Sequence, residues 1–120
     1  QGTTSTRCIA FSAQGDVIAT SQKPIHLSYP HNGWVEQGAH ELWQTSHDVL
    51  CDVLDKIPST LVALGITNQR ETTIIWDRAT GTPIAPAIVW QDRRTSETCE
   101  RLKAQGYETL IQERTGLLLD

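Results

Sequence analysis

The chain has 120 residues, of which 38% are hydrophobic, and a formal net charge of −4. This length fits a single domain with its own core, and the acidic balance gives no reason to expect nucleic-acid binding. No apolar run approaches the roughly 20 residues that a membrane-spanning helix needs. The cysteines Cys8, Cys51 and Cys99 are far apart and form no Cys-x-x-Cys pair. They therefore predict free thiols in a reducing cytoplasm, and neither a zinc site nor a disulfide framework.

The first half of the chain predicts a β-hairpin followed by a helix. Residues 7–11 and 17–21 are typical of two strands, and the Ala-Gln-Gly-Asp sequence at 13–16 is typical of the tight turn between them. Residues 26–38 are rich in turn formers and predict a loop. Residues 39–57 carry apolar side chains at helical spacing, and this helix is expected to stop at Pro58.

The second half predicts strands at 61–66, 72–76 and 84–90, followed by helices at 93–105 and 107–115. A hairpin turn at 78–83 separates the last two strands. Asp92 is expected to cap the first of these helices and Gly116 to end the second. Trp43 and Trp76 are expected in the core. This order of elements predicts a mixed α/β fold with a partly antiparallel sheet.

The most informative feature is the polar run Thr-Asn-Gln-Arg-Glu at 67–71, which follows the apolar run 61–66 without a break. Open α/β sheets bind ligands beyond the carboxyl ends of their strands. The adjacent Arg70 and Glu71 are therefore candidates to hold a small polar molecule, because a guanidinium donates hydrogen bonds and a carboxylate accepts them. The alternative is a solvated β-turn with one exposed salt bridge.

The N-terminal segment is a second candidate site. Gly2 allows a ligand to approach the backbone closely, and the hydroxyl residues Thr3, Thr4 and Ser5 can surround phosphate oxygens. Arg7 adds a charged donor. A polar hairpin tip explains the same residues equally well.

Trp90 is the third candidate, because it closes a predicted strand just before the polar residues 91–93. An indole ring in that position can cover the carbon side of a polyol while polar groups bind its hydroxyls. The alternative is an ordinary core tryptophan. The four histidines have no metal-ligand spacing.

Three segments together resemble the FGGY carbohydrate kinases. They are residues 1–7 (Gln-Gly-Thr-Thr-Ser-Thr-Arg), residues 30–36, and residues 65–73 (Gly-Ile-Thr-Asn-Gln-Arg-Glu-Thr-Thr) together with 88–94. The likeness extends over essentially all 120 residues. It implies a ribonuclease H-like α/β fold of the actin and hexokinase type, with two domains around a cleft. Residues 1–120 would be the N-terminal part of the first domain, a mixed sheet flanked by helices, and the second domain lies outside the chain.

Within this family, the pattern at 65–72 is similar to that of the members that act on glycerol. The resemblance implies transfer of the γ-phosphate of ATP to glycerol with Mg²⁺, giving sn-glycerol 3-phosphate. By the match of motifs, the implied nucleotide-binding residues are Thr3, Thr4, Ser5 and Arg7, and the implied substrate-binding residues are Arg70, Glu71 and Trp90.

The resemblance also implies what this stretch lacks. The family's metal-binding Asp directly precedes the glutamine that matches Gln1, and its catalytic base and adenosine-binding residues come later. No catalytic residue or metal ligand is therefore assigned here, and the 120 residues alone are not expected to phosphorylate glycerol. The full-length protein is expected to be a cytoplasmic homo-oligomer. The alternatives are another FGGY kinase, such as a pentulose kinase, or a non-catalytic nucleotide-binding relative.

Overall fold

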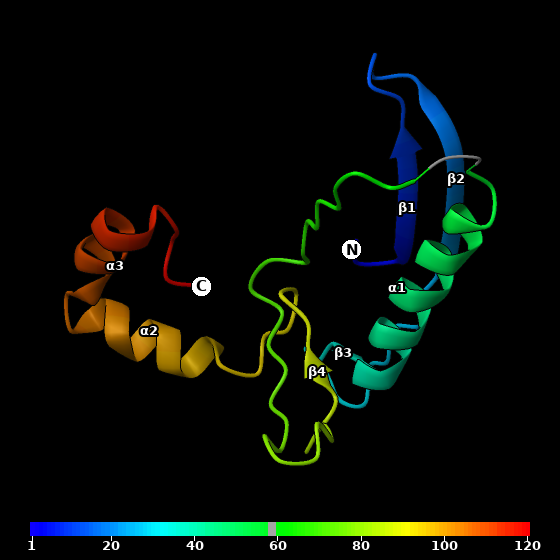
Figure 1. Ribbon diagram of the computed structural model, residues 1–120. Helices are drawn as coiled ribbons and strands as arrows, with labels where there is room; N and C mark the ends of the chain where they lie inside the picture. Colours follow the sequence, from blue (N-terminus) through cyan, green and yellow to red (C-terminus); the bar gives the residue numbers. More distant parts are fainter. Residues whose placement is uncertain (58–59) are drawn as a thin grey trace.

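The computed structural model describes residues 1–57 and 60–120, so the predicted stop at Pro58 lies outside the described residues. Figure 1 shows a long hairpin with a helix beside it, a small sheet at the base of that helix, and two short helices set apart. In chain order the elements are β1 (Ser5–Phe11), β2 (Val17–Pro24), β3 (Glu36–Gln37), α1 (Ala39–Leu54), β4 (Ala87–Ile88), α2 (Ser96–Ala104) and α3 (Tyr107–Thr115).

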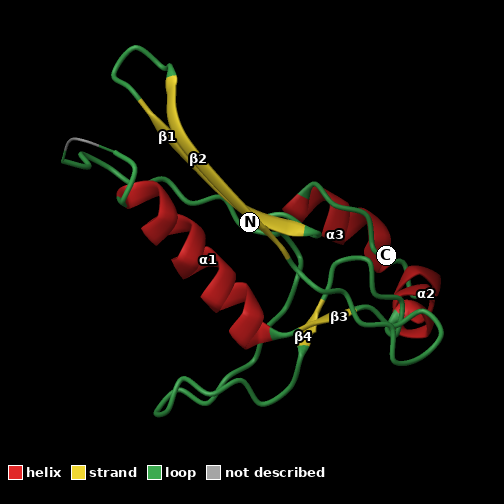
Figure 2. Ribbon diagram, turned by 90° about the vertical axis from the view of Figure 1, so that its right-hand side faces the viewer, coloured by secondary structure: helices red, strands yellow, loops and turns green. Residues whose placement is uncertain are grey.

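The predicted hairpin is confirmed. β1 and β2 pair antiparallel from Ser5↔Pro24 to Ala10↔Ala19, and a register shift follows before Phe11. Gly15 closes the turn at a φ of 90°, a conformation that glycine adopts without steric cost. α1 lies along this hairpin in both views (Figures 1 and 2).

The predicted helix is also confirmed, although α1 ends at Leu54, three residues before the predicted end at residue 57. Its buried side chains are Leu42, Val49 and Val53, and Leu42 packs against Ile25, Ala87 and Ile74. The prediction that Trp43 is core is wrong, since this residue is 68% exposed. Adjacent side chains of a helix point about 100° apart, so Trp43 points outward because its neighbour Leu42 points inward.

The predicted strand at 61–66 is not formed. Its apolar side chains are exposed, with Val62 at 96% and Ile66 at 85%. An extended segment becomes a strand only when its backbone groups pair with a neighbour. Among the residues that the structure describes, none pairs with 61–66 to form a ladder.

Of the predicted strands at 72–76 and 84–90, only the part at β4 (Ala87–Ile88) is formed, and the two segments otherwise meet as an irregular antiparallel pair. It is held by the isolated bridges Thr73↔Ile88 and Trp76↔Pro83. Prolines in the returning segment lack an N–H donor, which interrupts the ladder. Trp76 is 58% exposed, so its prediction as core is wrong. Besides its bridge to Thr73, β4 pairs with β3, which lies in the predicted loop 26–38. The pairings described are all antiparallel, whereas a mixed sheet was expected.

Two short helices complete the described structure and contact each other. α2 begins at Ser96, and its N-cap residue is Thr95, so the predicted capping role of Asp92 is wrong. α3 ends at Thr115, and its C-cap is Gly116 at a φ of 74°, as predicted. Over the described residues, no helix has the length and apolar character that crossing a membrane requires.

Candidate functional site

A cavity of about 360 Å³ lies where the N-terminal loop, the polar run and the end of the 84–90 segment meet. We call it the loop cavity. Its lining residues are Gln1, Gly2, Thr3, Asn68, Gln69, Arg70, Glu71 and Trp90. Four of the seven predicted site residues, from three distant parts of the sequence, therefore line one cavity.

Trp90 is fixed by hydrogen bonds at both its backbone and its ring. Its indole Nε1 donates to the hydroxyl of Thr3 at 2.9 Å, and its backbone N–H donates to the hydroxyl of Thr72 at 3.2 Å. The residue is nevertheless 54% exposed, so the interpretation as a core tryptophan is wrong. The ring presents an apolar surface at the edge of the loop cavity.

Arg70 and Glu71 form a turn whose backbone is strained. Glu71 has a φ of 62°, the left-handed conformation that costs a non-glycine residue roughly 1–2 kcal/mol. Both residues are exposed. Within the described parts of the chain, neither side chain takes part in an ion pair, so the alternative of a turn with its own salt bridge is not found. A guanidinium and a carboxylate are thus both available to a ligand, on a backbone whose strain is typical of functional sites.

The remaining predicted residues do not line this cavity. The carbonyl of Thr4 accepts a hydrogen bond from Ile25 N–H, and the hydroxyl of Ser5 accepts one from Gln22 Nε2. Arg7 lies on β1 opposite Gln22 and is exposed. The structure therefore brings Thr3 to the cavity, whereas Ser5 and Arg7 lie on β1.

Two glutamines that were not predicted as site residues join these segments. The side chain of Gln37 is buried, with 1% exposure, and its Nε2 donates to the carbonyl of Thr3 at 2.6 Å. Gln69 Nε2 donates to the carbonyl of Gly2 at 3.0 Å and to Gln37 Oε1 at 3.1 Å. Gln69 belongs to the polar run at 67–71. Gln37 carries no local signal, because its burial results from the pairing of β3 with β4.

A charged cluster holds the segment after Trp90 against β3. The carboxylate of Asp92 accepts hydrogen bonds from Arg94 Nε at 2.8 Å and Nη2 at 2.7 Å, and from Val35 N–H at 2.7 Å. Arg94 also pairs with Glu36 at 2.8 Å. We call Asp92, Arg94 and Glu36 the carboxylate clamp.

Electrostatics within the carboxylate clamp favour its charged form. Hydrogen bonds from Arg94, and then from the backbone N–H of Val35, lower the pKa of Asp92 from 3.8 to about 2. Hydrogen bonds to Asp92 and Glu36 raise the pKa of Arg94. The guanidinium also lies 3.8 Å from the centre of the Trp34 ring, which anchors the preceding loop as a cation–π contact.

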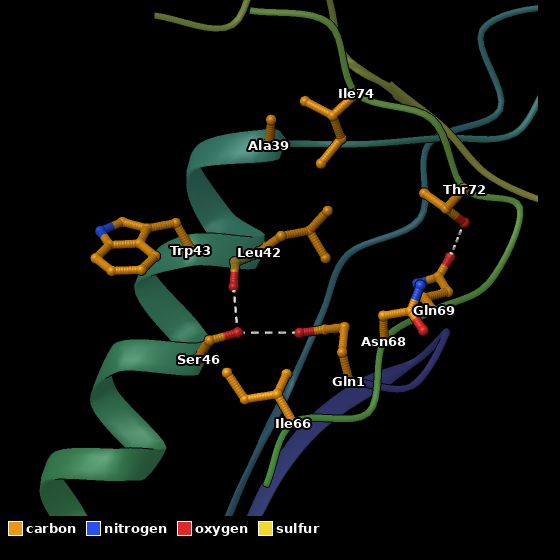
Figure 3. Close-up of a pocket in the computed structure, with 10 residues that line it drawn as sticks. All are labelled: Gln1, Ala39, Leu42, Trp43, Ser46, Ile66, Asn68, Gln69, Thr72 and Ile74. Carbon is orange, nitrogen blue, oxygen red and sulfur yellow. Dashed lines mark hydrogen bonds between the residues drawn. The ribbon is translucent and has the colours of Figure 1, made fainter. Parts of the chain in front are cut away.

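A second cavity, of about 370 Å³, lies between α1 and the 66–74 segment (Figure 3). Leu42, Ile66 and Ile74 contribute apolar side chains to it. Gln1 lines both cavities, and its Oε1 accepts a hydrogen bond from Ser46 of α1 at 3.0 Å. The helix thereby fixes the residue that begins the N-terminal loop.

The described residues offer no group of three or more His, Cys, Asp or Glu side chains that could hold a metal ion. The three cysteines are free, as predicted. The lining of the loop cavity offers hydrogen-bonding groups and one pair of opposite charges. Such a set suits a small ligand with several hydroxyl groups, each of which both donates and accepts.

Comparison with protein families gives a match over residues 1–120 to the N-terminal domain of the FGGY family of carbohydrate kinases. The chain is 57% identical over 123 residues to a glycerol kinase of Nitrosomonas eutropha and 51% identical to one of Shewanella baltica. All of this chain is covered in both cases, but it spans only about a quarter of the length of these relatives.

Solved structures give the same result for the fold. Glycerol kinase of Plasmodium falciparum with ADP matches all of this chain and 25% of its own, with a TM-score of 0.86 and 31% identity. Gluconate kinase of Lactobacillus acidophilus matches 98% of this chain and 24% of its own, with a TM-score of 0.89 at 20% identity, which shows the fold alone. These matches confirm the predicted ribonuclease H-like α/β fold, of which these residues form a part.

Proposed function

We propose, since the chain belongs to the FGGY family of carbohydrate kinases, that it is the N-terminal part of the first domain of an ATP-dependent glycerol kinase. The proposed reaction transfers the γ-phosphate of ATP to a terminal hydroxyl of glycerol and yields sn-glycerol 3-phosphate. The identity to relatives that carry the name glycerol kinase supports this substrate. Cytoplasmic location and homo-oligomeric assembly belong to the proposal on the strength of the family resemblance alone.

The observation that carries the proposal is the meeting of Thr3, Arg70, Glu71 and Trp90 in the loop cavity. Glycerol has three hydroxyls on a short carbon chain. In the proposal, the guanidinium of Arg70 donates hydrogen bonds to hydroxyl oxygens, and the carboxylate of Glu71 accepts hydrogen bonds from hydroxyl groups. The exposed ring of Trp90 covers the carbon atoms.

The phosphate side of the proposal rests on the N-terminal loop. The backbone at Gly2 turns tightly, with its N–H bonded to the carbonyl of Ser5 at 3.0 Å. A Cβ added at Gly2 would lie 3.0 Å from that oxygen, so a side chain would force the loop to shift. We propose that Thr3 faces the nucleotide phosphates. For Thr4, Ser5 and Arg7, the same role has the support of the family motif only.

Phosphoryl transfer needs positioning and charge stabilisation more than covalent catalysis. The family uses ATP with Mg²⁺, but the described residues do not provide a metal-binding cluster. We therefore assign neither a metal ligand nor a catalytic base to this chain. Its proposed contribution is to orient the acceptor hydroxyl and one side of the phosphates.

A substrate panel on the full-length protein tests the proposal. ADP release is measured with glycerol, xylulose, ribulose and gluconate as acceptors, and glycerol is expected to give the highest kcat/KM. A xylulose kinase of Rhodospirillum rubrum also matches this chain, with a TM-score of 0.86 and 25% identity. A higher kcat/KM for a ketose than for glycerol would therefore overturn the assignment as a glycerol kinase in favour of a pentulose kinase. ATP binding without turnover of any acceptor would favour the non-catalytic alternative.

A further inference from the structure

Gln37 is a buried polar side chain to which the proposed function gives no role. A buried amide is costly unless its donors and acceptor are satisfied. Both ends of this amide are used, since Nε2 donates to Thr3 O at 2.6 Å and Oε1 accepts from Gln69 Nε2 at 3.1 Å. The residue comes from β3, 34 positions along the chain from Thr3. Its amide therefore joins the small sheet to the N-terminal loop.

Gln69 continues this connection on the other side. Its Nε2 donates to Gly2 O at 3.0 Å across 67 positions of sequence. Its Oε1 accepts a hydrogen bond from the hydroxyl of Thr72. The oxygen of that hydroxyl in turn accepts a hydrogen bond from the backbone N–H of Trp90. Two neighbouring carbonyls of the N-terminal loop are thus held by two side-chain amides. One of these amides directly precedes Arg70 in the chain.

We propose that Gln37 and Gln69 are positioning residues for phosphoryl transfer. They set the backbone of Gly2 and Thr3, on the phosphate side, at a fixed distance from the Arg70–Glu71 turn and from Trp90, on the glycerol side. This inference rests on the proposed function. Both glutamines act through the residues that they hold. Because reaction between two bound groups depends steeply on their separation, an error of about 1 Å costs on the order of 100-fold in rate.

The test compares isosteric variants of the full-length protein. Gln69→Glu replaces the donor that faces Gly2 O and Gln37 Oε1 by an oxygen, while it keeps the size of the side chain. Gln37→Met removes both hydrogen bonds without adding charge. Gln14→Glu is the matched control, because Gln14 is exposed in the turn between β1 and β2, away from both cavities.

We expect Gln69→Glu and Gln37→Met to lower kcat by roughly 10- to 100-fold. The KM values for glycerol and ATP should change by less than about 3-fold, because the ligand-binding groups themselves are retained. The control should keep the kcat of the unmodified protein. A kcat within about 2-fold of that protein in both variants, or a rise in KM at constant kcat, would overturn the positioning role.

A second measurement is independent of turnover. In protein labelled with ¹⁵N-tryptophan, the indole signal of Trp90 is assigned by its loss in Trp90→Phe. We expect this signal to shift in Gln69→Glu, because the Trp90–Thr3 contact moves with the N-terminal loop, and to stay in place in Gln14→Glu. An unmoved signal in Gln69→Glu refutes the inference whatever the substrate. An unmodified protein that phosphorylates no glycerol refutes the proposed function instead.

Discussion

Replacement of Asp92 by asparagine should loosen the support of the candidate site. The side chain of Asp92 is 3% exposed, and its carboxylate binds Arg94 and the backbone N–H of Val35. Asparagine has nearly the same shape, but one carboxylate oxygen becomes an NH₂ group. That group would face a donor, either the guanidinium of Arg94 or the N–H of Val35. At least one hydrogen bond is therefore replaced by a clash of donors.

The magnitude follows from the electrostatics of the carboxylate clamp. A pKa lowered from 3.8 to about 2 corresponds to roughly 2 kcal/mol at 1.36 kcal/mol per unit. Screening by nearby solvent reduces this figure to roughly 1 kcal/mol. Leaving a buried donor unsatisfied adds about 1 kcal/mol or more. Arg94 keeps its pairing with Glu36, so the full cost of an orphaned buried charge does not arise. We expect Asp92→Asn to destabilise the protein by about 2 kcal/mol.

Urea unfolding of the full-length protein, followed by tryptophan fluorescence, measures this loss. Trp34 reports directly on the carboxylate clamp, because Arg94 stacks on its ring. Asp16→Asn is the matched control, since Asp16 is exposed in the hairpin turn, and a change within about 0.5 kcal/mol is expected there. If Asp92→Asn costs no more than Asp16→Asn, the reasoning about the carboxylate clamp is refuted.

The same variant gives a pH dependence of known sign. The folded pKa of Asp92, about 2, lies below its unfolded value of 3.8. Its charge therefore stabilises the folded state fully above pH 3.8, and this contribution is lost as the pH falls towards about 2. The difference in unfolding free energy between the unmodified protein and Asp92→Asn should shrink over that interval. A difference that stays constant from pH 5 to pH 2 would show that the charge of Asp92 is not responsible.

Two further predictions concern the Arg70–Glu71 turn. Glu71→Gly and Glu71→Ala both remove the carboxylate, but only glycine adopts a φ of 62° without strain. The free energy of unfolding of the glycine variant should therefore be about 1 kcal/mol higher than that of the alanine variant. At Glu113, inside α3, the alanine variant should be the more stable of the two, because glycine in a helix costs a similar amount relative to alanine. If the same variant is the more stable at both sites, the backbone at Glu71 is not strained. Arg70→Ala should raise the KM for glycerol at least 10-fold while the Kd for ADP changes less than about 3-fold, as measured by steady-state kinetics and calorimetry; equal losses for both ligands would argue against a role specific to the polyol.

Local sequence signals predicted the elements that are stabilised by nearby residues. The β1–β2 hairpin closes over a short turn with a glycine at positive φ, and α1 has an apolar face at helical spacing. Both patterns are complete within the segment itself. The segment 61–66 has an equally clear strand composition, but strand formation depends on a partner, which composition does not reveal. Asp92 was mispredicted for a related reason. An aspartate can cap a helix or form an ion pair, and the local sequence does not tell which of the two it does.

Half of the candidate site was predictable for a similar reason. Arg70, Glu71 and Trp90 each stand where a predicted element ends, a position from which side chains commonly reach ligands. Gln37 stands in a loop-like segment, and its role depends on a contact with Thr3 far away in sequence. No periodicity or composition marks such a residue. The positive φ of Glu71 was not predictable either, because residues 67–73 contain no glycine that would indicate a left-handed conformation.

The strain at Glu71 and the buried amides at Gln37 and Gln69 have a common consequence. A charged pair on a free turn would have many arrangements, and ordering it on a ligand would cost conformational entropy. Here the turn is already fixed in a conformation that an isolated peptide would avoid, and its neighbour Gln69 is bonded on both sides. The hydrogen bonds of the supporting network thus offset the strain before any ligand arrives. If the loop cavity binds glycerol as proposed, its selectivity depends as much on the residues that hold the turn as on the two charges that the turn presents.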